Sequence, residues 1–154
     1  MADVDVKVEM HLDHVEAVLK DVTDGVLKQF AYRVTERAQL NIRENNQIDT
    51  GFMVNSIYPI WKDGGSEYEA AVANASTQTL SVKTGRTVDH RDDFAPEPPL
   101  EGNAAAAVVV GANYAIYQEA LNPFLYPAAE AAAREFGVEA ERIYKQELPD
   151  EGPK

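Results

Sequence analysis

The sequence predicts an α+β domain in which an antiparallel sheet of about four strands is covered by a long N-terminal helix and a C-terminal helix. Three observations support this prediction. A strictly alternating segment opens the chain, a long segment with apolar residues at helical spacing follows it, and a second helical segment comes after several short apolar runs. No internal repeat is visible, so residues 1–147 are expected to form one domain, followed by a polar tail at 148–154.

The first predicted strand runs from Asp3 to Leu12, because valine, methionine or leucine occupies every second position and the residues between them are polar. Asp13 and Glu16 then have the spacing of a helix capping box. Apolar residues recur three and four positions apart along the helix that follows. Their stripe moves around the helix after Gly25, so we expect a kink or break there. The helix should end before the polar run at 44–47.

The middle of the chain reads as a turn followed by a hairpin. Asp49-Thr50-Gly51 is typical of a tight turn. Ser56–Trp61 and Tyr68–Ala73 are strand-like runs, and the Asp63-Gly64-Gly65 sequence between them predicts a hairpin. Pro59 has no N–H group to donate, so the first of these strands is expected at the edge of the sheet.

One long loop is predicted from residue 74 to residue 103, because this segment is polar, contains three prolines and has no hydrophobic period. We expect it to be mobile in the free protein and to become ordered against a neighbouring subunit or partner, with a short strand-forming piece adding to a sheet edge. The alternative is a solvated loop without a partner. The candidate contact residues are Leu80, Val82, Arg86 and Arg91.

Two further elements complete the domain. Ala105–Val110 is a candidate buried strand, and Tyr114–Glu119 is expected to extend it beyond a bend at Gly111. The last helix should begin at Pro123 and be weakened at Gly137. Its apolar residues are mostly three or four positions apart and comprise Phe124, Leu125, Ala128, Ala132, Phe136, Ala140 and Ile143.

The composition is strongly acidic, with 26 acidic and 14 basic residues and a formal net charge of -12. Direct nucleic-acid binding is disfavoured, because phosphate recognition needs clustered cations. The charge fits simple solubility, a surface that does not adhere to passing DNA, or a high-salt host. The absence of cysteine excludes disulfides. The longest apolar run, at 104–110, is too short to cross a bilayer, and no signal peptide is visible, so a soluble protein is expected.

Asp49-Thr50-Gly51 is also the signature tripeptide of aspartic proteases, in which two carboxylates share a proton. Those enzymes place it after an apolar strand, whereas a polar run precedes it here, so a structural turn is the preferred interpretation. The other candidate groups lack a complete ligand or nucleophile set: His11 with His14, the loop residues His90, Asp92 and Asp93, and the serines Ser56 and Ser66. We therefore expect no metal, no cofactor and no enzymatic activity.

Three segments occur in a characteristic order. They are Asp49-Thr50-Gly51-Phe52-Met53-Val54-Asn55-Ser56-Ile57, Val110-Gly111-Ala112-Asn113-Tyr114-Ala115-Ile116-Tyr117-Gln118-Glu119 and Pro123-Phe124-Leu125-Tyr126-Pro127-Ala128. Preceded by a strand and a long helix, they resemble the gene-ten-like family of lambdoid siphophages, which are tail-completion or neck proteins. The chain departs from the family pattern at Gln47-Ile48, at Ala120-Leu121 and in the length of the 74–103 loop.

The resemblance implies a structural virion protein of the tail top or neck, found in the host cytoplasm during assembly. It implies a homo-oligomeric ring, a hexamer by family analogy, that joins the tail-tube protein to the head-side connector or stopper protein. DNA would pass through without specific binding, and no membrane is involved. The alternatives are a tail morphogenesis factor absent from the mature virion and, more remotely, a protease using Asp49. The residues implied to be structural or interfacial are Asp49, Thr50, Gly51, Ser56, Ile57, Tyr114, Ala115, Tyr117, Glu119, Pro123, Phe124, Leu125, Pro127 and Ala128.

Overall fold

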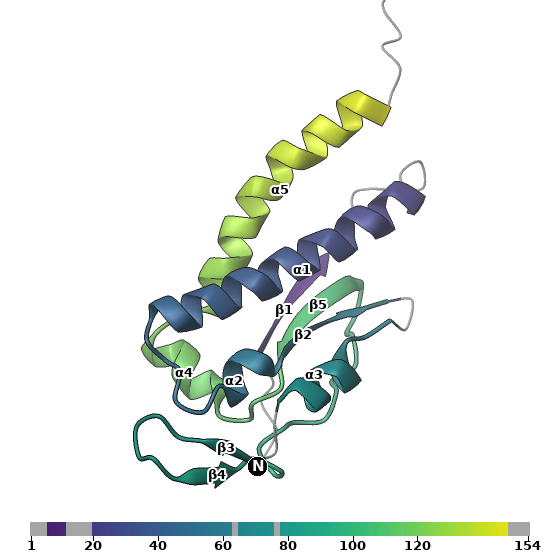
Figure 1. Ribbon diagram of the computed structural model, residues 1–154. Helices are drawn as coiled ribbons and strands as arrows, with labels where there is room; N and C mark the ends of the chain where they lie inside the picture. The colour runs from purple at the N-terminus through teal and green to yellow at the C-terminus, as the bar shows by residue number, and fades with distance from the viewer. Residues whose placement is uncertain (1–5, 12–19, 63–64, 76–77, 148–154) are drawn as a thin grey trace, which may run out of the picture.

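The computed structural model confirms the α+β class, with long helices on one side of a small antiparallel sheet (Figure 1). It describes residues 6–11, 20–62, 65–75 and 78–147. The elements in chain order are β1 (Val6–His11), α1 (Lys20–Glu44), α2 (Phe52–Asn55), β2 (Ile57–Trp61), α3 (Tyr68–Asn74), β3 (Gln78–Leu80), β4 (Thr87–Asp89), β5 (Ala104–Val110), α4 (Ala115–Leu121) and α5 (Leu125–Glu147).

The main sheet has three strands in the order β1-β5-β2, and both pairings are antiparallel. Val110 lies opposite Val6 on one side and Ile57 on the other, and the pairing of β1 with β5 shifts register between Met10 and His11. The strand predicted at Ala105–Val110 is therefore the central one. β2 lies at the edge of the sheet, as the presence of Pro59 predicted. A proline has no N–H group, so it cannot donate a backbone hydrogen bond to a second neighbouring strand.

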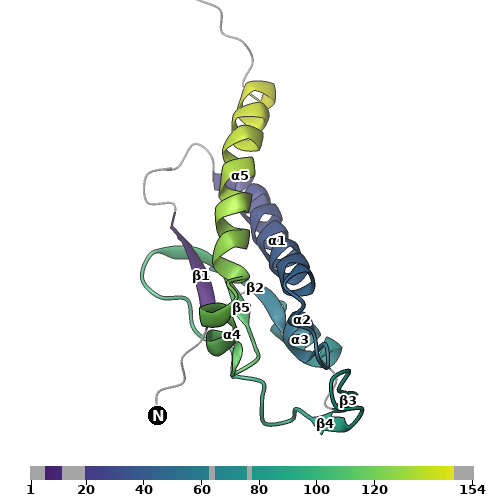
Figure 2. The same cartoon turned by 90° about the vertical axis from the view of Figure 1, so that its left-hand side faces the viewer.

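One face of the sheet packs against the two long helices, which lie next to each other (Figures 1 and 2). β5 contributes Ala106, Val108 and Val110 to this core. The two helices contribute the stripes predicted from their spacing, namely Leu27, Ala31, Val34, Ala38 and Ile42 from α1, and Leu125, Ala128 and Ala132 from α5 with Phe124 just before it. The helical periodicity thus predicted the buried faces correctly.

The opposite face of the sheet is also covered. Because side chains alternate along a strand, β5 turns Ala107 and Val109 to this side, where Tyr58 and Ile60 of β2 join them. The cover consists of Ala71 and Tyr68 from α3, together with Phe94 and Leu100 from the segment before β5. Burial on both faces explains why β5 is continuously apolar instead of alternating.

Two segments predicted as strands are helices. Tyr68–Ala73 belongs to α3, which begins where the Ser66 hydroxyl accepts a hydrogen bond from the Tyr68 N–H at 3.0 Å. The chain does reverse before α3, but only an isolated bridge joins Ile60 to Ser66. Tyr114–Glu119 does not extend β5 and instead lies largely in α4. Tyr68–Ala73 contains three alanines, and alanine favours a helix once one face can be buried.

Three further expectations need correction. α1 continues through Gly25, so no break divides the helix there. The 74–103 segment is not one structureless loop, because it contains β3 and β4, and these strands form a separate two-stranded sheet. The main sheet accordingly has three strands rather than four. Asp13 and Glu16, the tail and the side chains of Ala140 and Ile143 lie outside what the structure describes.

Candidate functional site

The Asp49-Thr50-Gly51 turn joins α1 to α2 and is the centre of the candidate site. Gly51 has a φ of 80°, a left-handed conformation that side-chain-bearing residues rarely adopt. The Thr50 hydroxyl accepts a hydrogen bond from the Phe52 N–H at 3.3 Å, which closes the turn at the start of α2. The segment 78–91, comprising β3, β4 and their connection, packs against this turn and is called the arm below.

Asp49 attaches the arm to the turn. Its Oδ1 accepts one hydrogen bond from the Ser81 hydroxyl at 2.6 Å and another from the Lys83 N–H at 3.0 Å. Its backbone carbonyl accepts a third from the Val82 N–H at 3.0 Å. The Ser81 hydroxyl, followed by the Lys83 N–H, lowers the pKa of Asp49 below its ordinary value. The Asp49 carboxylate therefore acts as a hydrogen-bond acceptor that holds the arm against the turn.

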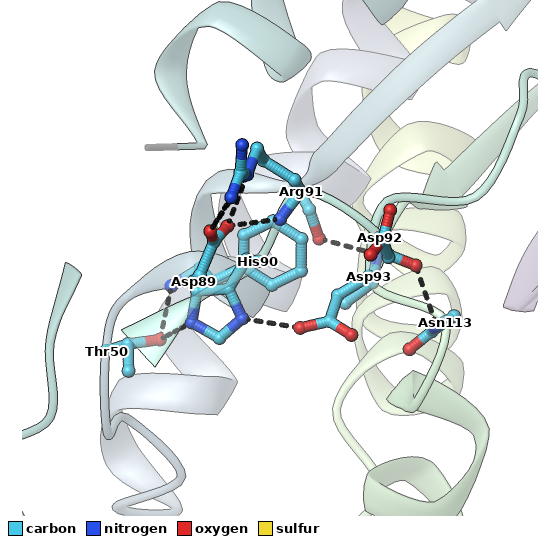
Figure 3. A network of polar contacts seen from close by, with 10 residues as sticks. Thr50, Asp89, His90, Arg91, Asp92, Asp93 and Asn113 are labelled. Carbon is cyan, nitrogen blue, oxygen red and sulfur yellow. Dashed lines mark hydrogen bonds and ion pairs between the residues drawn. The ribbon is translucent and has the colours of Figure 1, made fainter. Parts of the chain in front are cut away.

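Thr50, His90 and Asp93 form a second attachment (Figure 3). The Thr50 Oγ1 lies 2.9 Å from His90 Nε2, and His90 Nδ1 lies 2.8 Å from Asp93 Oδ2. The imidazole is buried and stacks on Phe52, with the ring centroids 4.3 Å apart and the planes within 4°. With a charged Asp93, the neutral ring carries its proton on Nδ1 and accepts from Thr50 at Nε2.

Tyr114 adds a third side to this cluster. Its ring centroid lies 6.2 Å from that of Phe52, the ring on which His90 stacks. Burial raises the pKa of Tyr114 to about 12, and the negative charges of Asp93 and Asp49 add to the effect. The phenol is therefore neutral at physiological pH and can serve as a hydrogen-bond donor.

A pocket of about 400 Å³ lies between the end of α1, the turn, α4 and the arm. Asp49, Thr50, His90 and Tyr114 line it, together with the side chains of several asparagines and glutamines. Asp49 is the only carboxylate among the described residues that line it. Acid protease chemistry needs two carboxylates that share a proton, and the described lining of this pocket supplies one.

The second motif segment is bound to the first through Ser56, which is fully buried. The Ser56 hydroxyl donates to the Met53 carbonyl at 2.8 Å and accepts from the Ala112 N–H at 3.0 Å. The Gly111 N–H donates to the Ser56 carbonyl at 2.8 Å. Gly111 has no room for a side chain, because a Cβ there would lie 2.4 Å from the Phe94 ring.

Glu119 ties the second motif segment to the third. Its carboxylate accepts hydrogen bonds from the N–H groups of Phe124, Leu125 and Tyr126, at 2.8, 2.9 and 2.9 Å. These are unpaired donors at the start of α5, so Glu119 caps that helix. α1 contributes as well, because the Asn41 amide donates to the Phe124 carbonyl at 2.9 Å. The first motif segment, which is distant in sequence from the other two, therefore joins them in one hydrogen-bonded cluster.

The remaining predicted residues divide by exposure. Ile57, Ala115, Phe124, Leu125 and Ala128 are buried in the core, and Pro127 is half-buried. Pro123 and Tyr117 are exposed, as are the four candidate contact residues of the arm. Arg91 is paired with Asp89 at 2.6 Å. The structure thus brings the motif residues together but leaves Tyr117 and the arm residues on the surface.

The sequence patterns did not predict the partnership of Thr50 with His90 or the packing of the partly buried Phe94 against the core. Forty positions separate Thr50 from His90, and no spacing rule connects them. His90, Asp92 and Asp93 do not assemble a metal site, and within the described residues no group of three potential ligands does. Within the same residues, no helix is long and apolar enough to span a membrane.

Comparison with protein-family models, with curated proteins and with solved structures finds no match to this chain.

Proposed function

We propose that this protein is a structural component of the tail top or neck of a tailed phage or virus. In this proposal it forms a homo-oligomeric ring, a hexamer by analogy with six-fold tail tubes, that joins the tail-tube protein to the head-side connector or stopper protein. Its place is the virion, after assembly in the host cytoplasm. It acts as a scaffold and not as an enzyme.

The observation that carries the proposal is the convergence of the three motif segments on one cluster. Their polar groups are occupied by structural hydrogen bonds: Ser56 holds the chain after β5, and Glu119 caps α5. Asp49 is likewise occupied, since it holds the arm. Because the polar atoms of the motif residues make structural hydrogen bonds, the motif supports a role in holding the fold together more than a role in a chemical reaction.

The net charge supports the same function. A formal charge of -12 on each copy would make the wall of a ring strongly negative. DNA phosphates would be repelled from such a wall, so DNA could slide through without specific binding.

The direct test is the mass of the assembly. The purified protein, alone and mixed with its tail-tube partner, is measured by native mass spectrometry, and the subunit copy number is determined in purified virions. We expect a closed ring, with six copies in the particle. A monomer or a two-fold dimer in the virion would contradict the proposal.

Two alternatives from the sequence have separate tests. A morphogenesis factor would be required for tail assembly yet absent from purified virions, which quantitative mass spectrometry of the particles decides. A protease would lose function on Asp49→Asn. The structural role predicts that this variant keeps function, because an asparagine oxygen can still accept from Ser81 and Lys83.

The Thr50, His90 and Asp93 arrangement favours one further candidate, a hydrolase. In such a site the Thr50 oxygen attacks an acyl carbonyl while His90 takes its proton and returns it to the leaving group, and water then releases the acyl group. Against this, Thr50 Oγ1 already accepts the Phe52 N–H. The test is turnover of fluorogenic esters. Hydrolysis that survives in Thr50→Ser and disappears in Thr50→Ala would favour the hydrolase over the scaffold.

A further inference from the structure

The arm presents an apolar and basic surface on an otherwise acidic molecule. Leu80 and Val82 are 64% and 79% exposed, although both are aliphatic. Residues 78–91 contain three basic residues and one acidic residue, whereas the whole chain contains 14 basic and 26 acidic residues. Arg86 is exposed and forms no ion pair within the described part of the chain. Such a surface is suited to contact an acidic partner that carries apolar side chains.

The arm is also held in a fixed position. Asp49 binds it on one side, through Ser81 and Lys83, and the contact between Thr50 and His90 binds it on the other. An arm that is already ordered loses little conformational entropy when it docks.

A second exposed apolar surface lies on α4 and the start of α5. Tyr117 and Leu121 are 68% and 74% exposed and lie four residues apart on α4, and Tyr126 is 64% exposed at the start of α5. Glu130 follows Tyr126 by one helical turn and is exposed. We name Tyr117, Leu121, Tyr126 and Glu130 the α4–α5 patch. It has the apolar and acidic groups that complement the arm.

In Figure 2, β3 and β4 of the arm and helix α4 lie in the lower half of the molecule, with α4 on the left and the arm on the right. A contact between the arm of one copy and the α4–α5 patch of another would join two different surfaces. Contacts between two different patches repeat around a ring, whereas a patch that contacts itself gives a two-fold dimer.

We propose that the arm of one copy docks onto the α4–α5 patch of a second copy, with Leu80 and Val82 against the aromatic and aliphatic side chains and Arg86 against Glu130. This inference rests on the proposed function for the ring, and it assigns the two surfaces that build it.

Disulfide cross-linking tests the contact directly, because the chain has no cysteine of its own. Val82→Cys and Leu121→Cys are purified separately, mixed at high concentration and oxidised. We expect a covalent dimer from the mixture and none from either variant alone, while the double variant should give higher multimers. The matched control replaces Leu121→Cys with Val138→Cys, which is equally exposed but about three turns further along α5 than Tyr126. It should give no cross-link.

Three results would overturn the inference: no cross-link in the mixture, a dimer of Val82→Cys with itself, or equal cross-linking of the control. Cross-linking of Val82→Cys to a different protein in assembled particles would also overturn it and would assign the arm to another partner.

Substitutions test the chemistry of the same contact. Leu80→Ser combined with Val82→Ser should weaken self-association about tenfold or more, with little effect on folding because both side chains are exposed. Arg86→Glu should weaken it roughly two- to fivefold, and adding Glu130→Arg should restore it. If Arg86→Glu weakens self-association and adding Glu130→Arg does not restore it, Glu130 is not the partner of Arg86.

The outcomes also separate this inference from the proposed function. If Val82→Cys and Leu121→Cys cross-link but this protein is absent from purified virions, the contact is supported and the virion function is contradicted. A ring in virions without the cross-link would support the function and contradict the contact.

Discussion

Gly111 is a residue whose role is set by its neighbour and not by its backbone conformation. It follows β5, and the Phe94 ring fills the space in which a side chain would stand. The Gly111 carbonyl accepts the Ala95 N–H at 2.7 Å, so the two segments are held together by their backbones as well. Phe94 in turn packs on Tyr58, which lies on the second face of the sheet, and on Tyr68, which covers that face.

We therefore expect Gly111→Ala to lower the free energy of unfolding by about 1 to 3 kcal/mol, because the added methyl group must displace the Phe94 ring. Chemical denaturation measures the effect. Gly137→Ala is the control, since nothing lies near a Cβ at that position of α5 and alanine is the better helix former. It should stabilise the protein by about 0.5 to 1 kcal/mol. Equal effects at both positions would contradict this account.

Phe124 is fully buried between the helices and the sheet, as its place at the head of the apolar stripe of α5 predicted. Phe124→Ala should cost about 3 to 5 kcal/mol of unfolding free energy, because it removes a large ring and leaves a cavity. Denaturant titration or a loss of soluble protein would report it. Tyr126→Ala, two positions along and exposed, should change stability by no more than about 0.5 kcal/mol. A Phe124→Ala protein of unchanged stability would refute the assignment.

At the scale of elements, the start of α5 depends on a side chain from α4. Helix starts are usually capped from within the preceding few residues, but here Glu119 accepts from three N–H groups across the turn between the helices. This contact fixes the angle between α4 and α5 and so shapes the α4–α5 patch.

Glu119→Ala should lower the unfolding free energy by about 1 to 2 kcal/mol, because the capped N–H groups of α5 lose their acceptor. Glu119→Gln should cost less, since an amide oxygen can still accept. The control is Glu130→Gln, because Glu130 is exposed and lies in α5, beyond the N–H groups that Glu119 caps. If Glu119→Ala and Glu130→Gln are equally mild, the cap contributes nothing to stability.

The attachment of the arm should depend on pH through Asp49. The pKa of this carboxyl is lowered in the folded state, first by the Ser81 hydroxyl and then by the Lys83 N–H. A lowered pKa means that the stabilisation is complete above the ordinary value of 3.8 and is lost as the pH falls below it.

The Lys83 amide should accordingly exchange with solvent faster, relative to its intrinsic rate, as the pH falls below 3.8. Hydrogen exchange followed by NMR measures this. Asp49→Asn should abolish the pH dependence while keeping part of the protection. Protection of Lys83 that is unchanged in wild-type protein at low pH would show that the carboxylate does not hold the arm.

At the scale of the whole molecule, the sheet is too small to form a core with one helical layer alone. Its second face is sealed by α3 and by the segment around Phe94, so residues that looked like a loop are part of the core. The excess of acidic residues must then lie mostly on the outer surfaces, since acidic side chains are rarely buried.

The whole-molecule charge leads to the expectation that the protein does not bind duplex DNA at physiological salt, because a surface with a net charge of -12 repels phosphates. An electrophoretic mobility-shift assay checks this. A basic DNA-binding protein of similar size serves as the positive control. A shift that weakens steeply with added salt would contradict the expectation and would direct attention to the basic arm.

The elements whose signal is long or chemically unambiguous could be predicted from the sequence alone. Leu27 through Ile42 repeat often enough to specify a buried helical face, and the apolar run before Gly111 is too continuous for an exposed strand. Pro59 specified an edge because it lacks a donor. The turn at Gly51 and the buried Phe124 could likewise be predicted from local residue types or from helical spacing.

The short and the non-local features depend on the tertiary structure. Seven-residue segments such as α3 and α4 have little intrinsic preference, and the burial of Ala71 and Ala115 selects the helix. The pairing of Thr50 with His90 and the attachment of the arm to Asp49 depend on contacts between residues 32 to 40 positions apart. The position of Phe94 depends on packing against the second face of the sheet. No local pattern encodes such contacts, because they exist only once the chain has closed around its core.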